Sequence, residues 1–311
     1  MKVILNFVLL ACTYLFIANG CRQKNITVAD TPKSGTIFIS VDESFRPVIE
    51  EQINVYESSF PGTHIIASYK PEAACIKDML FDTTNRMVII TRGLSDKEDK
   101  FLFDSLKFRP SWNALATDAI AIIVNSSSND TLFTLERLRQ QLSGKISTTQ
   151  KIVFDGLSTT STLRFITDSV LKGDVLDTSL VKASKTSKDV IDFIAGDKNA
   201  VGLVGISWIG NPEDTAQLSL LKKVKIAYVK CSICKDIPYV KPLQQSILSK
   251  RYPLVRGLYY VLKENYNGLG SGFVNFLKYE RGQLIFKRAY LGPTMDFRSR
   301  NIKINQTLPK N

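Results

Sequence analysis

The feature that most constrains the fold is a repeated alternation of short apolar runs with segments of helical periodicity. Helical spacing follows the first run from about Asp42 to Ser58, and it follows the second run from Pro71 onward. This β-α-β-α-β order predicts parallel strands that are buried on both faces. A second block of the same kind begins near residue 119. The runs expected to form strands are 36–41, 64–69, 87–91, 119–125, 151–154 and 200–205.

Length, composition and charge further limit the fold class and the kind of partner that the chain can have. The chain has 311 residues, 44% of them hydrophobic, which is a globular composition and predicts an α/β protein. That length allows one large domain or two lobes of about 150 residues each. The formal net charge of +12 favours an anionic partner: a phosphate-like ligand, nucleic acid or a membrane surface. The basic runs at 222–225 and 298–300 are short and more typical of solvated faces, so no nucleic acid partner is expected.

Residues 1–20 have the pattern of a signal peptide. Lys2 is the only charge, an apolar run reaches Ala18, and the small residue Gly20 precedes Cys21. A cysteine at this place predicts a bacterial lipoprotein that is cut before Cys21 and lipidated there, with 21–33 as a polar linker. Plain secretion and an uncleaved anchor helix are the alternatives. All three place the body outside the cytoplasm, and the lipid would attach it to a membrane in the periplasm or at the cell surface.

Three cysteines remain beyond the signal region and its lipidation site. Cys231 and Cys234 form a C-x-x-C pair, which favours a small disulfide in an oxidising compartment over a zinc half-site or a redox pair. Zinc needs four ligands, and only Cys75 and His64 are left to contribute. His64 is the single histidine, so multi-histidine metal sites are excluded. No metal and no cofactor are expected.

A run of serine and threonine residues follows the strand at 151–154, where a helix is expected to begin. The backbone N–H groups of a helix N-terminus and neighbouring hydroxyls can hold an oxyanion together. Capping of the helix alone is the simpler alternative. Three other strand-to-helix junctions lie at the same edge of a parallel sheet, where ligands bind in α/β folds. The four junctions are Ser158 to Thr162, Asp42-Glu43-Ser44-Phe45, Lys70-Pro71-Glu72-Ala73 and Thr91-Arg92-Gly93.

Several segments resemble the PstS-type phosphate-binding proteins of ABC transporters, which have the type II periplasmic binding protein fold. The tail carries the most specific similarity, in YPLVRGLYY at 252–260, GLGSGFVNFL at 268–277 and GQLI at 282–285. Phe154-Asp155-Gly156, followed by Thr160-Ser161-Thr162, is similar to the family's phosphate loop. Ser44-Phe45-Arg46-Pro47 is similar to its first contact segment. The resemblance covers roughly residues 34–294.

The resemblance implies two α/β lobes with a mixed, mostly parallel sheet and a cleft that closes over a dehydrated anion. Lobe I would comprise 34–118 plus 257–311, and lobe II would comprise 119–256. Hydroxyl and backbone N–H donors at the junctions would bind the ligand. The positions that correspond to contacts, or that lie where the family has them, are Ser44, Phe45, Ala73, Thr91, Arg92, Thr160, Ser161 and Thr162.

The sequence departs from the family at one place. The family has Ser-Asp after the third strand, and its aspartate accepts the proton of bound phosphate, whereas this chain has Thr91-Arg92. An arginine cannot accept a hydrogen bond but can donate two to an oxyanion. Three alternatives stay open: another acid accepts the proton, selectivity for phosphate is weakened, or Arg92 points away into a surface salt bridge. The acid that accepts the proton would be Glu43 or Glu72. The salt-bridge partner of Arg92 would be Asp96 or Glu98.

The leading hypothesis is a monomeric solute-binding lipoprotein that captures phosphate, or a similar oxyanion, for the permease of an ABC transporter. An interaction or sensor lipoprotein on the same fold is the alternative. A phosphate-ester hydrolase is disfavoured, because the sequence has one histidine and lacks a G-x-S-x-G nucleophile motif. We therefore expect a binding protein and not an enzyme.

Overall fold

The computed structural model describes residues 30–146, 148–156, 160–295 and 297. From Thr31 onward the chain forms one compact unit with its own hydrophobic core. The predicted signal peptide and the lipidation site Cys21 lie outside the described residues, as does the middle of the hydroxyl-rich loop, 157–159. Within the described ranges, no helix is both long and apolar enough to cross a bilayer.

A mixed sheet runs through the compact unit, and its first half supports what we call lobe I. Its strand order is β2-β1-β3-β12-β4, with β13 added on β4. The pairs of β1 with β2 and β3 are parallel, whereas β12 is antiparallel to both of its neighbours. The strands of this half are β1 (Ser34–Asp42), β2 (Gly62–Lys70), β3 (Asn85–Ile90), β4 (Ser111–Asn125), β12 (Val255–Leu262) and β13 (Gly292–Pro293).

The second half of the sheet supports lobe II, with the order β4-β8-β6-β7 and β9 added on β4. Here β6 is parallel to β7 and β8, and β4 is antiparallel to β8 and β9. A separate small sheet has the order β11-β10-β5. The strands are β6 (Lys151–Phe154), β7 (Val181–Ala183), β8 (Ala200–Gly205), β9 (Val224–Ile226), β5 (Leu132–Phe133), β10 (Tyr228–Lys230) and β11 (Tyr239–Val240).

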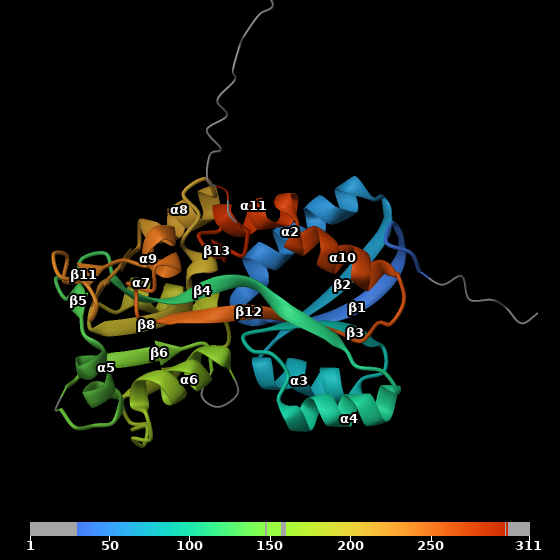
Figure 1. Ribbon diagram of the computed structural model, residues 1–311. Helices are drawn as coiled ribbons and strands as arrows, with labels where there is room; N and C mark the ends of the chain where they lie inside the picture. The colour runs from blue at the N-terminus through green and yellow to red at the C-terminus, as the bar shows by residue number, and fades with distance from the viewer. Residues whose placement is uncertain (1–29, 147, 157–159, 296, 298–311) are drawn as a thin grey trace, which may run out of the picture. The chain divides into compact units, whose positions relative to one another are not determined.

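Helices cover both faces of each half (Figure 1). In lobe I one face carries α2 (Arg46–Ser59), α10 (Leu269–Lys278) and α11 (Glu280–Arg288), and the other carries α3 (Glu72–Phe81) and α4 (Asp96–Leu106). In lobe II one face carries α7 (Ser187–Gly196), α8 (Thr215–Leu221) and α9 (Gln244–Leu248). The other face carries α5 (Leu135–Leu142) and α6 (Ser161–Ile166), which continues as a π-helical turn, Thr167–Leu171. Short 3₁₀ turns are η1 (Glu43–Phe45) and η3 (Ile206–Trp208).

The strand β4 joins the two halves. Its residues up to Ala119 pair with β12 and β13, and its residues from Ile120 onward pair with β8 and β9. The stretch from Ala119 to Val124 is fully buried, which explains its unbroken apolar sequence. Figure 1 shows β4 and β12 running side by side from one lobe into the other. The α/β fold class is confirmed, and the antiparallel pairs of the large sheet all involve one of these two crossing strands.

The first residues of α10 are held by a buried carboxylate. Glu264 accepts hydrogen bonds from the backbone N–H groups of Gly268, Gly270 and Ser271 at 2.9, 3.1 and 2.9 Å. An acid at a helix N-terminus satisfies donors that the helix leaves open. The approach is close, because a Cβ on Gly270 would lie 2.6 Å from Glu264 Oε2 and 2.6 Å from Leu262 Cδ1. The glycine-rich segment at 268–272 therefore packs the fold around an acid of the chain itself.

We expect Gly270→Ala to lower the free energy of unfolding by about 1–3 kcal/mol, because the new methyl group must displace buried neighbours. Urea denaturation measures the effect. Gly196→Ala is the matched control, since no atom lies within 4 Å of the Cβ it would add. Equal stability of the two variants would contradict the close packing at Gly270.

Candidate functional site

A cluster of buried polar groups lies where the two lobes meet. Asp42 ends β1 and leads into Ser44, Asp155 directly follows β6, and Ser161 is the first residue of α6. Arg256, near the start of β12, lies among them and is only 5% exposed. The junctions after β1 and β6 therefore converge, although 111 residues separate Ser44 from Asp155.

Arg256 is the cation at the centre of this cluster. Its Nε donates to Asp118 Oδ2 at 2.7 Å, and its Nη1 donates to Ser161 Oγ at 2.9 Å. The guanidinium also lies over the ring of Phe45, with 5.1 Å from Cζ to the ring centroid, a cation–π contact. Burial opposes its charge, but the nearby carboxylates, Asp118 first, raise the pKa of Arg256 overall. It therefore stays charged inside the protein.

Three buried carboxyl groups surround this single guanidinium. Burial raises the pKa of Asp42 to about 6, although the charge of Arg256 opposes the shift. Burial likewise raises the pKa values of Asp118 and Asp155. Among the described residues, no hydrogen-bond partner reaches Asp42 Oδ2, Asp155 Oδ1 or Arg256 Nη2. The cluster thus offers one further N–H donor and further carboxyl oxygens that can accept or carry a proton.

Hydroxyl groups from both lobes meet at Asp155. Its Oδ2 accepts from Ser44 Oγ at 3.3 Å, from Thr162 Oγ1 at 3.4 Å and from Ser187 Oγ at 3.5 Å. Ser44 Oγ also lies 3.4 Å from Ser161 Oγ. These contacts are at the long end of the hydrogen-bond range. The arrangement is a set of buried hydroxyl groups around one carboxylate, and hydroxyl donors of this kind can also hold an oxyanion taken out of water.

The loop after β1 also reaches the start of α7. Glu43 accepts from Ser187 Oγ at 2.8 Å and from Ser187 N at 3.2 Å. This carboxylate satisfies a donor at the helix N-terminus and bridges lobe I to lobe II. Burial raises the pKa of Glu43 to about 7, with Asp155 adding to the shift and the hydrogen bonds from Ser187 opposing it. Glu43 is therefore protonated in part near neutral pH.

A second bridge between the lobes involves Glu72, Thr91 and Arg164. Arg164, on α6, donates through Nε to Glu72 Oε2 at 2.7 Å and through Nη2 to Thr91 Oγ1 at 2.7 Å. Thr91 in turn donates to Glu72 Oε1, from N at 2.9 Å and from Oγ1 at 2.5 Å. Burial alone would raise the pKa of Glu72, but Arg164 and Thr91 together lower it. The bridge is therefore ionised at neutral pH.

The residues singled out from the sequence fall into two groups. Ser44, Phe45, Ser161 and Thr162 lie in the buried cluster, and Thr160 caps α6 beside it by accepting from Leu163 N at 3.4 Å.

Thr91, Ala73 and Arg92 lie away from that cluster. Thr91 belongs to the second bridge, and Ala73 is exposed on the first turn of α3. Arg92 donates two hydrogen bonds of 2.7 Å to Glu98, and this pairing lowers the pKa of Glu98 to about 2. Of the alternatives left open for Arg92, the structure shows the salt bridge with Glu98.

Several residues of the site were not identified from the sequence. Arg256 was noticed only as part of the YPLVRGLYY segment, and its partner Asp118 lies where strand β4 had not been expected. Ser187 begins α7 and Arg164 lies on α6, and no local pattern reveals that these helices contact lobe I. A buried arginine within an apolar strand was the available signal for Arg256, because such a charge needs a partner.

Residues 27–280 match the PBP superfamily domain, so the chain belongs to the PBP superfamily. No curated protein sequence matches the chain at a significant level.

Solved structures share the fold. One is described as a phosphate ABC transporter substrate-binding protein with bound phosphate from Clostridium perfringens (20% identity, 84% of this chain and 100% of that chain, TM-score 0.69). An ABC-type phosphate transport receptor from Vibrio cholerae is similar at 19% identity, over 82% of this chain and 99% of that one, with a TM-score of 0.58. The periplasmic molybdate-binding protein of Azotobacter vinelandii is similar at 8% identity, over 83% and 100%, with a TM-score of 0.55.

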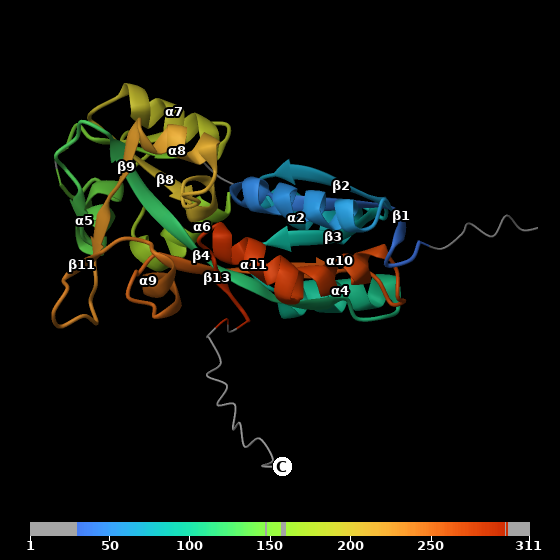
Figure 2. The ribbon, with the colours of Figure 1, turned by 90° about the horizontal axis from the view of Figure 1, so that it is seen from above.

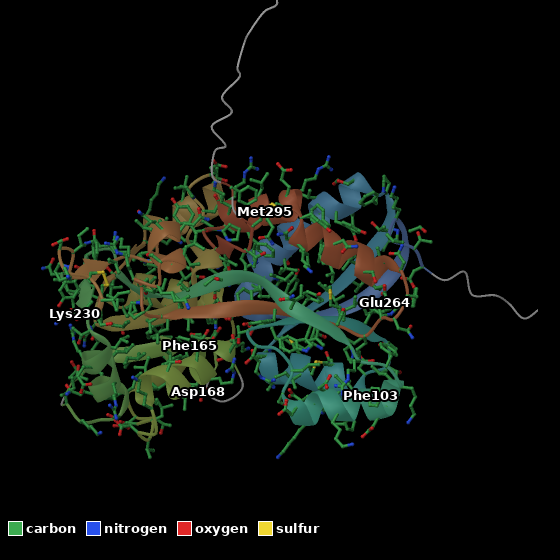
Figure 3. The ribbon with its side chains drawn as sticks, viewed as in Figure 1. Phe103, Phe165, Asp168, Lys230, Glu264 and Met295 are labelled. Atoms are coloured by element: carbon green, nitrogen blue, oxygen red, sulfur yellow. A yellow bond between two sulfur atoms is a disulfide. The ribbon has the colours of Figure 1, made fainter. Side chains whose placement is uncertain are left out.

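We expect the bridge between Arg164 and Glu72 to couple energetically. Arg164→Met leaves the Glu72 carboxylate, whose side chain is 3% exposed, without its cation, so the free energy of unfolding should fall by about 1–3 kcal/mol. Adding Glu72→Gln should recover part of the lost stability. Urea denaturation of the two single variants and the double variant gives the coupling energy between the two residues. Asp168→Asn removes the exposed partner of the same arginine (Figure 3) and should change stability by less than about 0.5 kcal/mol. A coupling energy near zero would contradict the bridge.

Glu43 should make the protein less stable as the pH rises from about 5 to 8. Its folded pKa of about 7 lies above the ordinary value of 4.5, so the folded state binds the proton more tightly than the unfolded state. The resulting stabilisation is complete below about pH 4.5 and is lost as the pH rises through 7. Glu43→Gln should remove on the order of 2–3 kcal/mol of this pH dependence in denaturation curves. Glu50→Gln, at an exposed acid, should leave it intact, and unchanged curves for both variants would refute the role of Glu43.

Proposed function

We propose that the protein is an extracytoplasmic lipoprotein that captures inorganic phosphate, or a closely related oxyanion, for the permease of an ABC transporter. The observation that carries the proposal is the buried cluster between the lobes, where Arg256 lies among hydroxyl donors and protonatable carboxyl groups. The Clostridium perfringens structure, described with bound phosphate, has the same fold over its whole length. The N-terminal pattern of a signal peptide followed by Cys21 supports the location and the lipid anchor.

The site would bind the anion through donors from both lobes. We assign Arg256 Nη2, the hydroxyls of Ser44, Ser161 and Thr162, and backbone N–H groups of the η1 and α6 junctions to the ligand oxygens. Thr160 and Phe45 would contribute through the backbone. A charge-assisted bond from the buried guanidinium is the strongest of these contacts. Thr91, Ala73 and Arg92 are not part of this ligand set.

The acidic groups favour a ligand that carries its own proton. Phosphate near neutral pH has an O–H that can donate to Asp42 or Asp155, whereas sulfate and molybdate do not. A fully deprotonated anion would instead face carboxylate oxygens without a donor between them, which is repulsive in a buried site. These acids would replace the aspartate that the family has at the position of Arg92. Phosphate and arsenate are therefore the preferred ligands.

Titration calorimetry on ligand-stripped protein tests the proposal. Phosphate and arsenate should bind, and sulfate and molybdate should bind much more weakly. Thr162→Val keeps the shape of the side chain but removes its hydroxyl, so it should cost about 1–3 kcal/mol of phosphate binding. Thr215→Val, on the exposed start of α8, is the control and should bind phosphate like the original chain.

Other outcomes distinguish the alternatives. Absence of heat with every oxyanion would refute ligand capture and favour an interaction or sensor protein on the same fold. Turnover of a phosphate ester would indicate a hydrolase. Preference for molybdate over phosphate would show that Asp42 and Asp155 do not select a proton-bearing ligand.

A further inference from the structure

The small sheet of β5, β10 and β11 presents an unusual surface at the end of lobe II. Both ribbon views place it far from β1, β2 and β3 (Figures 1 and 2). The turn from Cys231 to Pro238 joins β10 to β11, and Figure 2 shows it projecting from the edge of the lobe. None of its residues takes part in the buried cluster between the lobes, so the surface has no role in the proposed capture of phosphate.

The two faces of the small sheet differ sharply. Phe133 and Val229 are fully buried on the inner face. On the outer face, Tyr228 is 39% exposed, and Lys241 Nζ lies 4.7 Å from the centroid of its ring. Lys230 also lies exposed on β10, and Figure 3 labels it at this end of the molecule. The outer face therefore combines an aromatic ring with ammonium groups.

The turn carries two large aliphatic side chains into solvent. Ile233 is 66% exposed and Ile237 is 52% exposed. The disulfide of Cys231 with Cys234 closes the turn, and Cys231 N donates to Pro238 O at 2.8 Å. These two links hold the turn in a fixed shape, so the isoleucines cannot easily fold back onto the protein.

The charge around these isoleucines is positive. Lys230, Lys235 and Lys241 outnumber Asp236, which leaves a local excess of 3 − 1 = +2. Exposed aliphatic tips within a ring of lysines and a tyrosine match the boundary of an anionic bilayer. There, apolar groups enter the acyl region, tyrosine rings lie at the headgroups, and lysines pair with phosphate groups.

We propose that this surface, made of Tyr228, Lys230, Ile233, Lys235, Ile237 and Lys241, docks on an anionic phospholipid membrane. A projecting turn suits a lipid surface better than a protein groove, because lipid adapts to a convex shape. Docking would add a second, non-covalent contact to the lipid expected at Cys21. The contact would hold lobe II against the membrane.

Vesicle co-sedimentation tests this proposal on the chain from Thr31 onward, which forms a compact unit and lacks the lipidation site. It should bind phosphatidylglycerol vesicles, bind phosphatidylcholine vesicles weakly, and dissociate as salt rises. The double variant Ile233→Ser with Ile237→Ser should weaken partitioning at least about fivefold. Replacing the three lysines with glutamine should weaken it about tenfold or more.

Leu248→Ser, at a 51% exposed leucine on α9, is the matched control and should partition like the original chain. Urea denaturation of every variant shows whether it is folded, and calorimetry with phosphate on the same variants separates this proposal from the proposed function. Equal binding to both kinds of vesicle would overturn membrane docking. So would equal partitioning of the isoleucine variant and Leu248→Ser, or no binding to phosphatidylglycerol at all.

Discussion

The ion pair of Arg256 with Asp118 is the interaction on which the candidate site depends. A guanidinium this deeply buried is tolerated only because carboxylates surround it, and the carboxylates are tolerated because of the guanidinium. Asp118 belongs to β4 and Arg256 to β12, the two strands that cross between the lobes. The charge of the site is therefore attached to the scaffold that connects the lobes, and hydroxyl groups from each lobe arrange themselves around it.

The excess of acid over base gives this site its chemical character. Asp42, Asp118 and Asp155 share one buried arginine, and burial raises the pKa of each acid. In a site of this kind, protonation of the acids as well as ion pairing neutralises the excess negative charge. The acids Glu43 and Glu72 have different tasks, since each of them bridges the two lobes to a partner on α7 or α6.

Local pattern predicted the parallel strands β1, β2, β3, β6 and β8, because each contains a short apolar run bounded by turn residues. It missed β7 (Val181–Ala183), which is parallel to β6 and only three residues long. The sequence pattern identified only the end of β4. The first part of this strand, Ser111 to Asp118, mixes polar and apolar residues, because β4 has different neighbours along its length. The helix α4 was missed although Ser95 and Glu98 form a capping box that the sequence displays. Contacts such as Arg164 with Glu72 join residues 92 positions apart, and no local pattern encodes such a pairing.

The change of partners along β4 has a mechanical consequence. Both crossings described between the lobes are hydrogen-bonded strands, so no loose loop is available there to act as a swivel. Any change in the angle between the lobes has to be absorbed as twist of a two-stranded ribbon around Ala119 and Ile120. Such a ribbon resists sliding more than bending, so any movement of one lobe against the other should keep the strands of the two halves in register.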